Sequence, residues 1–441
     1  MAPAQTQGPP TEPRAVILGG GTAGFMAAAH LSHHLPRWRL LHVFDSGLPS
    51  LGVGEGTLPS FPPWLRSMAG VEMPALAELC DATYKLGVRF EGWGRHREVF
   101  FHNFGAGSYA LHLTAERLPA LLARHIRATR LDDRVTALSS DGRRVRLELA
   151  SGGALEADFV FDARGFPWAE LDDQHRLPGI PTDAALLRRG PVSGLTGGTR
   201  AVARPHGWIF VIPLAHRTSY GYIHCRELSS REEVAADFDH FLSEEGLTTE
   251  GEERLLPFPN FRRRSLFDGA LFRLGNAAAF LEPLEATAIG LILHQLQVAG
   301  HWLRDELVGV GGEAKWSAEV LAEVNRELTE TVDAVGLFVV WHYRAGSVYD
   351  TPFWSHARAE AADALAKAEG TPVGHRFQTL LRAAARLSRS AVEKIRDPET
   401  YRQSILPHLE SVPDGDRGFG GFDAASFAQV GYGLGLLDEG E

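Results

Sequence analysis

The sequence predicts an α/β fold in which a parallel-sheet module is combined with an antiparallel sheet segment and a helical C-terminal region. Three observations support this prediction. An apolar run near the N-terminus ends in glycines and leads into a helix, residues from about Val192 to Arg226 alternate apolar and polar in short runs, and apolar residues recur at nearly helical spacing after Gly275. The 441 residues, 44% of them hydrophobic, suffice for up to about three such units.

The N-terminal module begins with a βαβ unit. Residues Ala15 to Leu18 are predicted to form a strand, Ala23 to Leu35 a helix and Leu40 to Phe44 a second strand. A further apolar strand, Phe159 to Phe161, runs into the loop Asp162 to Gly165. Ligands of open α/β sheets bind at such strand ends, so this module is predicted to be Rossmann-like.

Composition and charge argue against several classes of protein. The 55 Asp and Glu residues outnumber the 44 Lys and Arg residues, and a net charge of -11 disfavours nucleic acid as a partner. No apolar run has membrane-spanning length. The two cysteines, Cys80 and Cys225, are expected to be buried thiols of a cytoplasmic protein, and no histidine stands in a metalloprotease motif, so no metal is expected.

The loop from Gly19 to Gly24 has the spacing G-x-G-x-x-G. In that pattern the first glycine allows a tight turn, the second lets the backbone approach a pyrophosphate, and the third allows close helix–strand packing. These positions are Gly19, Gly21 and Gly24, and the N–H groups of the following helix, which begins around Thr22 and Ala23, can bind the anion.

Asp45 closes the second predicted strand, 21 residues after Gly24. An acid at this place binds the ribose hydroxyls of a dinucleotide, and the absence of a neighbouring Arg disfavours a 2′-phosphate. The alternative interpretation is a helix that merely packs tightly on a sheet, with Asp45 as a turn residue. The strand, loop and acid together favour the dinucleotide.

Five segments, in the same order along the chain, carry a resemblance to a known family: 19–24, 52–59 (GVGEGTLP), 84–90 (YKLGVRF), 207–214 (GWIFVIPL) and 282–287 (EPLEAT). Together they resemble the flavin-dependent halogenases, the family typified by tryptophan halogenases. Further similarity at 350–354 (DTPFW) and 430–435 (VGYGLG) extends the resemblance over nearly the whole chain.

The resemblance implies a flavoprotein monooxygenase-type module that binds FAD. It also implies that reduced FAD (FADH2), from a separate flavin reductase, and O2 oxidise chloride or bromide to hypohalous acid, which crosses a tunnel to a small aromatic substrate. The residues expected to bind the cofactor are Gly19, Gly21, Thr22, Ala23, Gly24, Asp45, Gly54, Glu55, Asp162, Gly165, Gly275 and Asn276.

Lys85 and Glu285 are the catalytic residues that the resemblance implies. Lys85 is predicted to lie mid-strand and to share a face with Gly87 and Arg89, from which it would hydrogen-bond hypohalous acid or carry the halogen as a haloamine. From spacing alone, a strand Lys is expected to be solvated. Glu285 precedes a helix predicted to begin near Thr287 and would orient the oxidant or accept the ring proton, although it could simply complement the helix dipole.

The N–H groups of Thr287 and Ala288, at the start of that helix, are candidates for holding the halide. Trp208 is the family's shielding tryptophan, and Phe210 replaces a second one; the pair could equally form one core face of a strand. Ala286 replaces the family's serine, which removes a hydroxyl group. Ala288 replaces the family's glycine, which narrows the space beside the backbone at the proposed halide site.

Two other functions stay open at this stage: a flavin monooxygenase that inserts oxygen directly and has no need of Lys85, and a non-catalytic flavoprotein. The chain looks shorter than a typical tryptophan halogenase, which suggests a reduced helical cap. Oligomeric state, including a homodimer, is left open. Aromatic residues expected near the substrate, or equally in the core, are Phe101, Phe104, His342, Tyr343, Phe353 and Trp354.

The expected organisation has three parts. Residues 1–14, rich in Pro, Gln and Thr, are predicted to be a disordered tail. Residues 15–305 form the FAD-binding module, with the substrate-side sheet interleaved at about 185–265. Residues 306–441 form the helical, substrate-binding C-terminal region.

Overall fold

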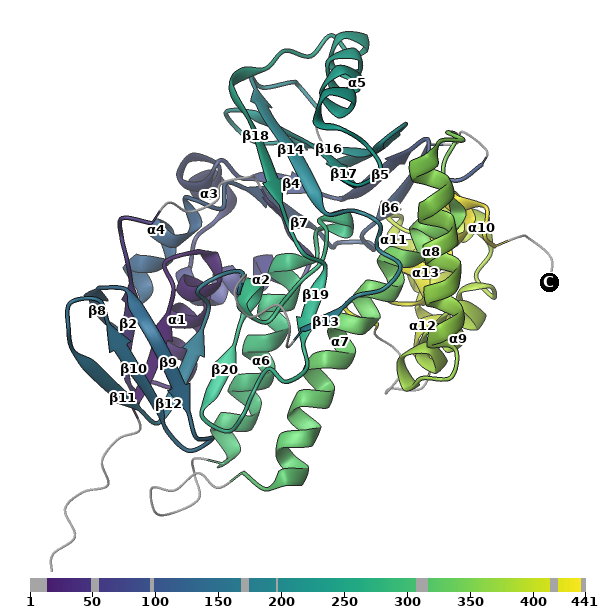
Figure 1. Ribbon diagram of the computed structural model, residues 1–441. Helices are drawn as coiled ribbons and strands as arrows, with labels where there is room; N and C mark the ends of the chain where they lie inside the picture. The colour runs from purple at the N-terminus through teal and green to yellow at the C-terminus, as the bar shows by residue number, and fades with distance from the viewer. Residues whose placement is uncertain are drawn as a thin grey trace, which may run out of the picture.

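The computed structural model describes residues 14–48, 55–95, 99–167, 174–195, 197–306, 316–412 and 419–437. It contains a parallel sheet, a larger mostly antiparallel sheet and a group of C-terminal helices (Figure 1). The predicted α/β class with these three parts is confirmed.

A five-stranded parallel sheet forms the N-terminal layer. Its strands, in spatial order, are β20 (Leu271–Arg273), β12 (Phe159–Asp162), β1 (Arg14–Leu18), β2 (Arg39–Phe44) and β8 (Thr129–Asp132). Side chains of β1 alternate between two apolar cores. Ala15 and Ile17 pack against α1 (Thr22–His34) and α6 (Ala288–Glu306). Val16 and Leu18 face a three-stranded antiparallel sheet, β9 (Val135–Ser140), β10 (Val145–Leu149) and β11 (Ala154–Ala157). Burial on both faces explains the continuous apolar run.

The second sheet has seven strands. In order they are β18 (Glu250–Pro257), β14 (Ala184–Gly190), β17 (Thr218–His224), β16 (Gly207–Pro213), β15 (Thr199–Arg204), β5 (Gly87–Glu91) and β6 (Val99–Asn103). All neighbours are antiparallel except β15 and β5, which run parallel. The predicted antiparallel segment is therefore present, and it also recruits two strands from much earlier in the chain.

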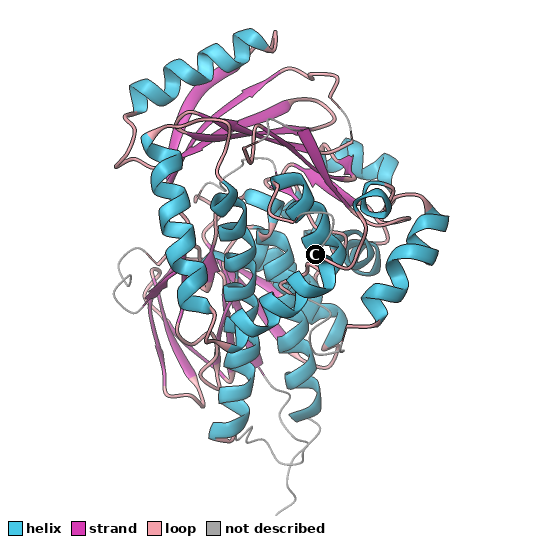
Figure 2. Cartoon of the chain, turned by 90° about the vertical axis from the view of Figure 1, so that its right-hand side faces the viewer, coloured by secondary structure: helices cyan, strands magenta, loops and turns pink. Residues whose placement is uncertain are grey.

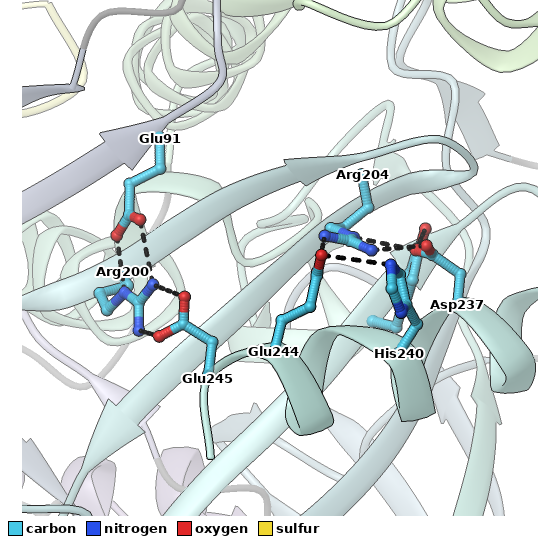
Figure 3. A network of polar contacts seen from close by, with 8 residues as sticks. Glu91, Arg200, Arg204, Asp237, His240, Glu244 and Glu245 are labelled. Carbon is cyan, nitrogen blue, oxygen red and sulfur yellow. Dashed lines mark hydrogen bonds and ion pairs between the residues drawn. The ribbon is translucent and has the colours of Figure 1, made fainter. Parts of the chain in front are cut away.

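Helix α5 (Arg231–Glu244) covers the outer face of this sheet, at the top of the molecule in Figure 2. Two buried guanidinium groups of β15 fix it there (Figure 3). Arg200 pairs with Glu91 of β5 at 2.6 Å and with Glu245 at 2.8 Å, and Arg204 pairs with Asp237 of α5 at 2.6 Å. These charge-assisted bonds lie on the face that α5 covers. The opposite, inner face of the sheet can therefore line a site.

Two small sheets and the remaining helices complete the fold. One sheet consists of β3 (Glu55–Gly56), β7 (Ala110–Leu113) and β4 (Thr83–Lys85). The other consists of β13 (Gln174–Arg176), β19 (Phe261–Arg263) and β21 (Ala279–Phe280). The other helices are α2 (Phe61–Ala69), α3 (Met73–Cys80), α4 (Leu118–Leu122), α7 (Ala318–Ala345), α8 (Pro352–Ala368), α9 (Pro372–Ala384), α10 (Arg389–Glu393), α11 (Pro398–Thr400), α12 (Leu406–Glu410) and α13 (Ala424–Leu434). Among the described residues no helix is long and apolar enough to cross a membrane.

The prediction that Lys85 lies in the middle of one strand is wrong. The chain leaves β4 at Lys85 and enters β5 at Gly87, and the two strands belong to different sheets. The alternation of side chains between two faces does not continue across this crossing: Tyr84 is exposed, whereas Val88 and Phe90, which were predicted to share its face, are buried. Lys85 therefore does not share a face with Arg89.

Candidate active site

The glycine loop connects β1 to α1. Close packing requires glycine at two of its three glycine positions. Gly19 has a φ of +116°, and a Cβ there would lie 2.4 Å from the carbonyl oxygen of Ala163. A Cβ at Gly24 would lie 2.0 Å from the carbonyl oxygen of Gly19. No described atom lies within 4 Å of the Cβ position of Gly21. The middle glycine therefore leaves the backbone open to a ligand, beside the unpaired N–H groups of Thr22 and Ala23.

The other predicted nucleotide residues gather at the same edge of the parallel sheet. Asp45 follows β2 directly, and its Oδ1 accepts a hydrogen bond from the Gly47 N–H at 2.9 Å. Asp162 ends β12, where its carboxylate binds the guanidinium of Arg164 at 2.8 and 2.9 Å. Gly165 has a φ of +98° and open space at its Cβ position. Gly54 lies outside the described residues, and of Glu55 only the backbone, at the start of β3, is described.

A cavity of about 460 Å³ lies between the inner face of the seven-stranded sheet and the start of α6. Gly275 packs on the start of α1, since a Cβ at Gly275 would lie 2.8 Å from Cβ of Ala23. The predicted site residues that line the cavity are Trp208, Phe210, Asn276, Glu285, Ala286, Thr287 and Ala288. The structure thus brings the expected shielding and halide residues and Asn276 together around one cavity.

Lys85 is fully buried behind the cavity wall. Its Nζ donates to the carbonyl oxygen of Thr57 at 3.0 Å and lies 5.5 Å from the ring centroid of Phe104. Burial lowers the pKa of Lys85 to about 8, although the negative charge of Glu285 opposes the shift. The expectation of a solvated side chain, which follows from spacing alone, is wrong here.

Gly56 separates Lys85 from the cavity. It lines the cavity, and a Cβ at this position would lie 3.3 Å from Nζ of Lys85 and 3.0 Å from Cβ of Ala286. Any larger residue would close this narrow space. Glycine at position 56 therefore keeps the ammonium group close to the cavity without crowding.

Glu285 occupies a strained turn between β21 and α6. Both Glu285 and Ala286 have left-handed backbone conformations, with φ of +65° and +55°, and a residue with a Cβ pays roughly 1–2 kcal/mol for such a conformation. The Ala286 N–H donates to the carbonyl oxygen of Pro283 at 2.9 Å and closes the turn. Consecutive strained residues at a cavity are typical of a functional site. The helix then begins at Ala288, as predicted.

Two buried histidines hold the Glu285 carboxylate. Nδ1 of His102 lies 2.8 Å and 2.9 Å from its two oxygens, and Nε2 of His342 lies 3.1 Å from Oε1. Burial alone would raise the pKa of Glu285, but the charges of these histidines and their hydrogen bonds lower it well below its usual range. These surroundings therefore favour the ionised form of Glu285.

A second buried carboxylate supports the cavity wall. Trp208 donates from Nε1 to the Tyr343 hydroxyl at 2.9 Å, and that hydroxyl donates to both oxygens of Glu282 at 2.8 Å. Thr182 is the other hydroxyl donor to Glu282. Burial raises the pKa of Glu282 to about 7 against these hydrogen bonds. The chain Trp208–Tyr343–Glu282 fixes the indole ring in the wall.

The predicted aromatic residues separate into different environments. Phe104 lies near Lys85, and His342 and Tyr343 belong to the hydrogen-bonded networks described above. Phe353 and Trp354 are core residues, and Phe101 is 42% exposed on β6. Cys80 and Cys225 are buried and free, as expected, and no cluster of metal ligands occurs among the described residues.

Sequence reasoning missed His102, Glu282 and Gly56 as functional candidates. Glu282 stands in the segment Glu282–Thr287, and its position as a second acid three residues before Glu285 is a signal that could have been used. Gly56 stands in the segment 52–59, which contains three glycines, and the sequence alone does not distinguish Gly56 from the other two. Nothing in the local sequence around His102 indicates a carboxylate 183 residues away.

Comparison with known proteins assigns the family. The family model described as tryptophan halogenase matches residues 14–109 and 106–371, which is most of the chain. The chain belongs to the tryptophan halogenase family. It is thus an enzyme of the flavin-dependent halogenase family, whose members use FAD.

This halogenase is 25% identical to a tryptophan 6-halogenase of Streptomyces toxytricini over 445 residues, covering 80% of this chain and 82% of the relative. Its fold matches a flavin-dependent halogenase from Brevundimonas sp. BAL3 with a TM-score of 0.74 at 23% identity, covering 97% of this chain and 91% of the other. A flavin-dependent halogenase from Xanthomonas campestris matches with a TM-score of 0.72 at 23% identity, with 97% of each chain covered.

Proposed function

We propose that this halogenase uses FADH2 and O2 to oxidise chloride or bromide to hypohalous acid, and that Lys85 and Glu285 direct this oxidant onto an electron-rich aromatic substrate. Indole-like and phenol-like rings are the expected substrate classes, since relatives of this chain are named tryptophan halogenases. One observation carries the proposal: the buried Lys85 ammonium lies behind Gly56, in the wall of a cavity that Glu285 also lines.

The residues around the glycine loop fit FAD. Open backbone at Gly21 and the first N–H groups of α1 suit the pyrophosphate, and a carboxylate directly after β2, at Asp45, suits the ribose hydroxyls. The mostly apolar cavity walled by Trp208 and Phe210 suits a flat ring system. Bound reduced FAD supplies the electrons for the reduction of O2, and we propose that a separate flavin reductase provides it.

The start of α6 is the proposed halide site. The first N–H groups of a helix have no intrahelical acceptor, and the residues there, Thr287 and Ala288, line the cavity. The positive end of the helix dipole adds to this attraction for an anion. Ala286 and Ala288 are small enough to leave the space clear.

Lys85, buried behind Gly56, and Glu285, which lines the cavity, act on the oxidant. The ammonium group of Lys85 donates a hydrogen bond to hypohalous acid and holds it, while Glu285 exchanges protons with the reacting groups. Trp208 and Phe210 separate the organic substrate from the cofactor side. This division lets halide be oxidised in one place and the ring be attacked in another.

Product mass tests the proposal. Purified protein is incubated with FAD, NADH, a flavin reductase and indole or phenol substrates, with chloride, with bromide or with neither. We expect halogen isotope doublets that depend on the halide present. A gain of one oxygen regardless of halide would instead establish a monooxygenase, and bound flavin without any product would point to a non-catalytic flavoprotein.

A further inference from the structure

His342 lies in α7 with both ring nitrogens facing oxygen atoms. Its Nδ1 is 2.8 Å from the carbonyl oxygen of Phe338, and its Nε2 is 3.1 Å from Oε1 of Glu285. A carbonyl oxygen can only accept a hydrogen bond, so Nδ1 must carry a proton. A neutral imidazole has one N–H group, and its Nε2 would then direct a lone pair at the carboxylate.

Such an arrangement of two acceptors would be repulsive in this environment. The side chains of His342 and Glu285 are 0% and 1% exposed, so water does not screen them. The flipped ring would offer only C–H groups to both oxygens, which is worse. The geometry therefore requires one more proton in this pair than a neutral histidine beside an ionised glutamate would hold.

We propose that His342 is an imidazolium in the resting enzyme and stores the proton that Glu285 passes on during halogen transfer. This role rests on the proposed function. It makes His342 a positioning and proton-storing residue that acts through Glu285.

The surroundings favour the proton on the imidazole over the carboxylate. His102 already donates to both oxygens of Glu285, and these bonds help to lower the pKa of the carboxylate. With Lys85 protonated, the ionised Glu285, the imidazolium and the ammonium have a net charge of +1. The two protonated groups can stabilise the oxygen of HO–X, on which negative charge develops as the O–X bond breaks.

The stored proton completes the chemistry of halogen transfer. The HO–X bond breaks with its electron pair on oxygen, and that oxygen takes the proton of the His342–Glu285 pair to leave as water. The halogen bonds to a ring carbon through a π electron pair of the ring. The C–H bond then breaks, its electrons return to the ring, and its proton restores the pair, so the enzyme ends the cycle unchanged.

Nitrogen-15 NMR of the histidine side chains tests the resting state without depending on halogenation. The His342 signals are assigned by difference from His342→Gln in the full chain. We expect both His342 nitrogens to be protonated in the wild-type protein, and Nε2 to become unprotonated in Glu285→Gln, whose amide can donate to it. An unprotonated Nε2 in the wild-type protein would overturn the inference even if halogenation is established.

The pH profile of single-turnover halogenation tests the role in catalysis. Among the described residues, the titratable groups that act on the pair are His102 of β6, which contacts Glu285, and Lys85 of β4, whose charge interacts with Glu285. The charge of Lys85 acts in turn on His112 of β7. His342→Gln keeps an N–H donor toward Glu285 but stores no proton, so its rate should fall by about tenfold or more and rise toward low pH as solvent supplies the proton. The wild-type rate should be flat below pH 8.

His102→Asn is the matched control, because its amide replaces the Nδ1 donor to the same carboxylate. It should slow the reaction yet keep the flat profile of the wild-type enzyme. FAD binding and thermal melting report whether each variant folds. A His342→Gln profile parallel to that of the wild type would show a purely structural role and overturn the inference.

Discussion

His102 and Glu285 form a two-point contact across 183 residues of sequence, with Nδ1 of the histidine 2.8 and 2.9 Å from the two carboxylate oxygens. The contact ties edge strand β6 to the strained turn that precedes α6. A carboxylate held on both oxygens has one orientation, which suits the oxidant-directing role that we propose for Glu285. The predictions below test this arrangement and the cofactor site that serves it.

The glycine loop offers a matched pair of substitutions. Gly24→Ala places a Cβ 2.0 Å from the Gly19 carbonyl oxygen, so it should destabilise the fold by about 1–3 kcal/mol as well as weaken FAD binding. Gly21→Ala meets open space, so its melting temperature should stay that of the wild type while its Kd for FAD rises about tenfold or more. Calorimetry and flavin fluorescence measure the two effects. Equal loss of stability in both variants would contradict this interpretation of the loop.

Lys85 should give the halogen-transfer step an alkaline limit. Because burial lowers the pKa of Lys85 to about 8, the ammonium donor is lost above that pH, and the single-turnover rate should then fall by about tenfold per pH unit. A rate that rises through pH 8 would favour a neutral amine that carries the halogen.

The same shift affects stability. Between pH 8 and the ordinary lysine pKa of about 10.4, the unfolded chain binds a proton at Lys85 that the folded chain does not, so this residue's contribution to the unfolding free energy rises with pH. Lys85→Met removes the contribution. Denaturant unfolding of both proteins at pH 7.5 and 9.5 measures it, and parallel changes in the two proteins would contradict the assigned pKa.

Gly56→Ala tests the narrow space between the cavity and Lys85. The added methyl group would lie 3.3 Å from Nζ of Lys85 and 3.0 Å from Cβ of Ala286. We expect FAD to bind and FADH2 to be oxidised, while halogenated product falls by about tenfold or more. Stopped-flow flavin absorbance and product mass separate these steps. Full halogenation by this variant would show that the oxidant takes another path.

Tyr343→Phe removes the hydroxyl between Trp208 and Glu282. The buried Trp208 N–H then loses its acceptor and the buried Glu282 carboxylate keeps Thr182 but loses the Tyr343 donor, so the unfolding free energy should fall by roughly 2 kcal/mol. Looser packing of Trp208 should also raise the share of FADH2 that is oxidised without product. Tyr109→Phe, which loses only a 3.4 Å contact with Arg66, serves as the control. A melting curve for Tyr343→Phe like that of the control would contradict the network's role.

The parts of the site that were predicted from sequence depend on local geometry. The strand–turn–helix at Gly19 to Gly24 and the helix start after Glu285 are set by neighbouring residues, and the structure has both where they were expected. The resemblance to halogenases drew attention to Lys85, which the structure buries, although the strand geometry predicted for it was wrong.

The remaining parts depend on how distant strands pair. The crossing at Leu86 takes Lys85 into one sheet and Gly87 into another, because β4 pairs with β7 while β5 pairs with β15. The contacts of Glu285 with His102 and His342 likewise join segments that meet only in the folded chain. Periodicity within a short window contains no information about such partners.

Lys85→Met tests most directly whether Lys85 directs an oxidant that is made elsewhere in the enzyme, as we propose. Lys85→Met keeps the length of the side chain and removes the ammonium group, so flavin oxidation and its kinetics should stay those of the wild type. With FADH2, O2, bromide and an indole substrate, the account predicts that brominated product falls by about a hundredfold or more while a soluble hypobromous acid scavenger becomes brominated. Undiminished bromination of the indole by Lys85→Met would contradict the account.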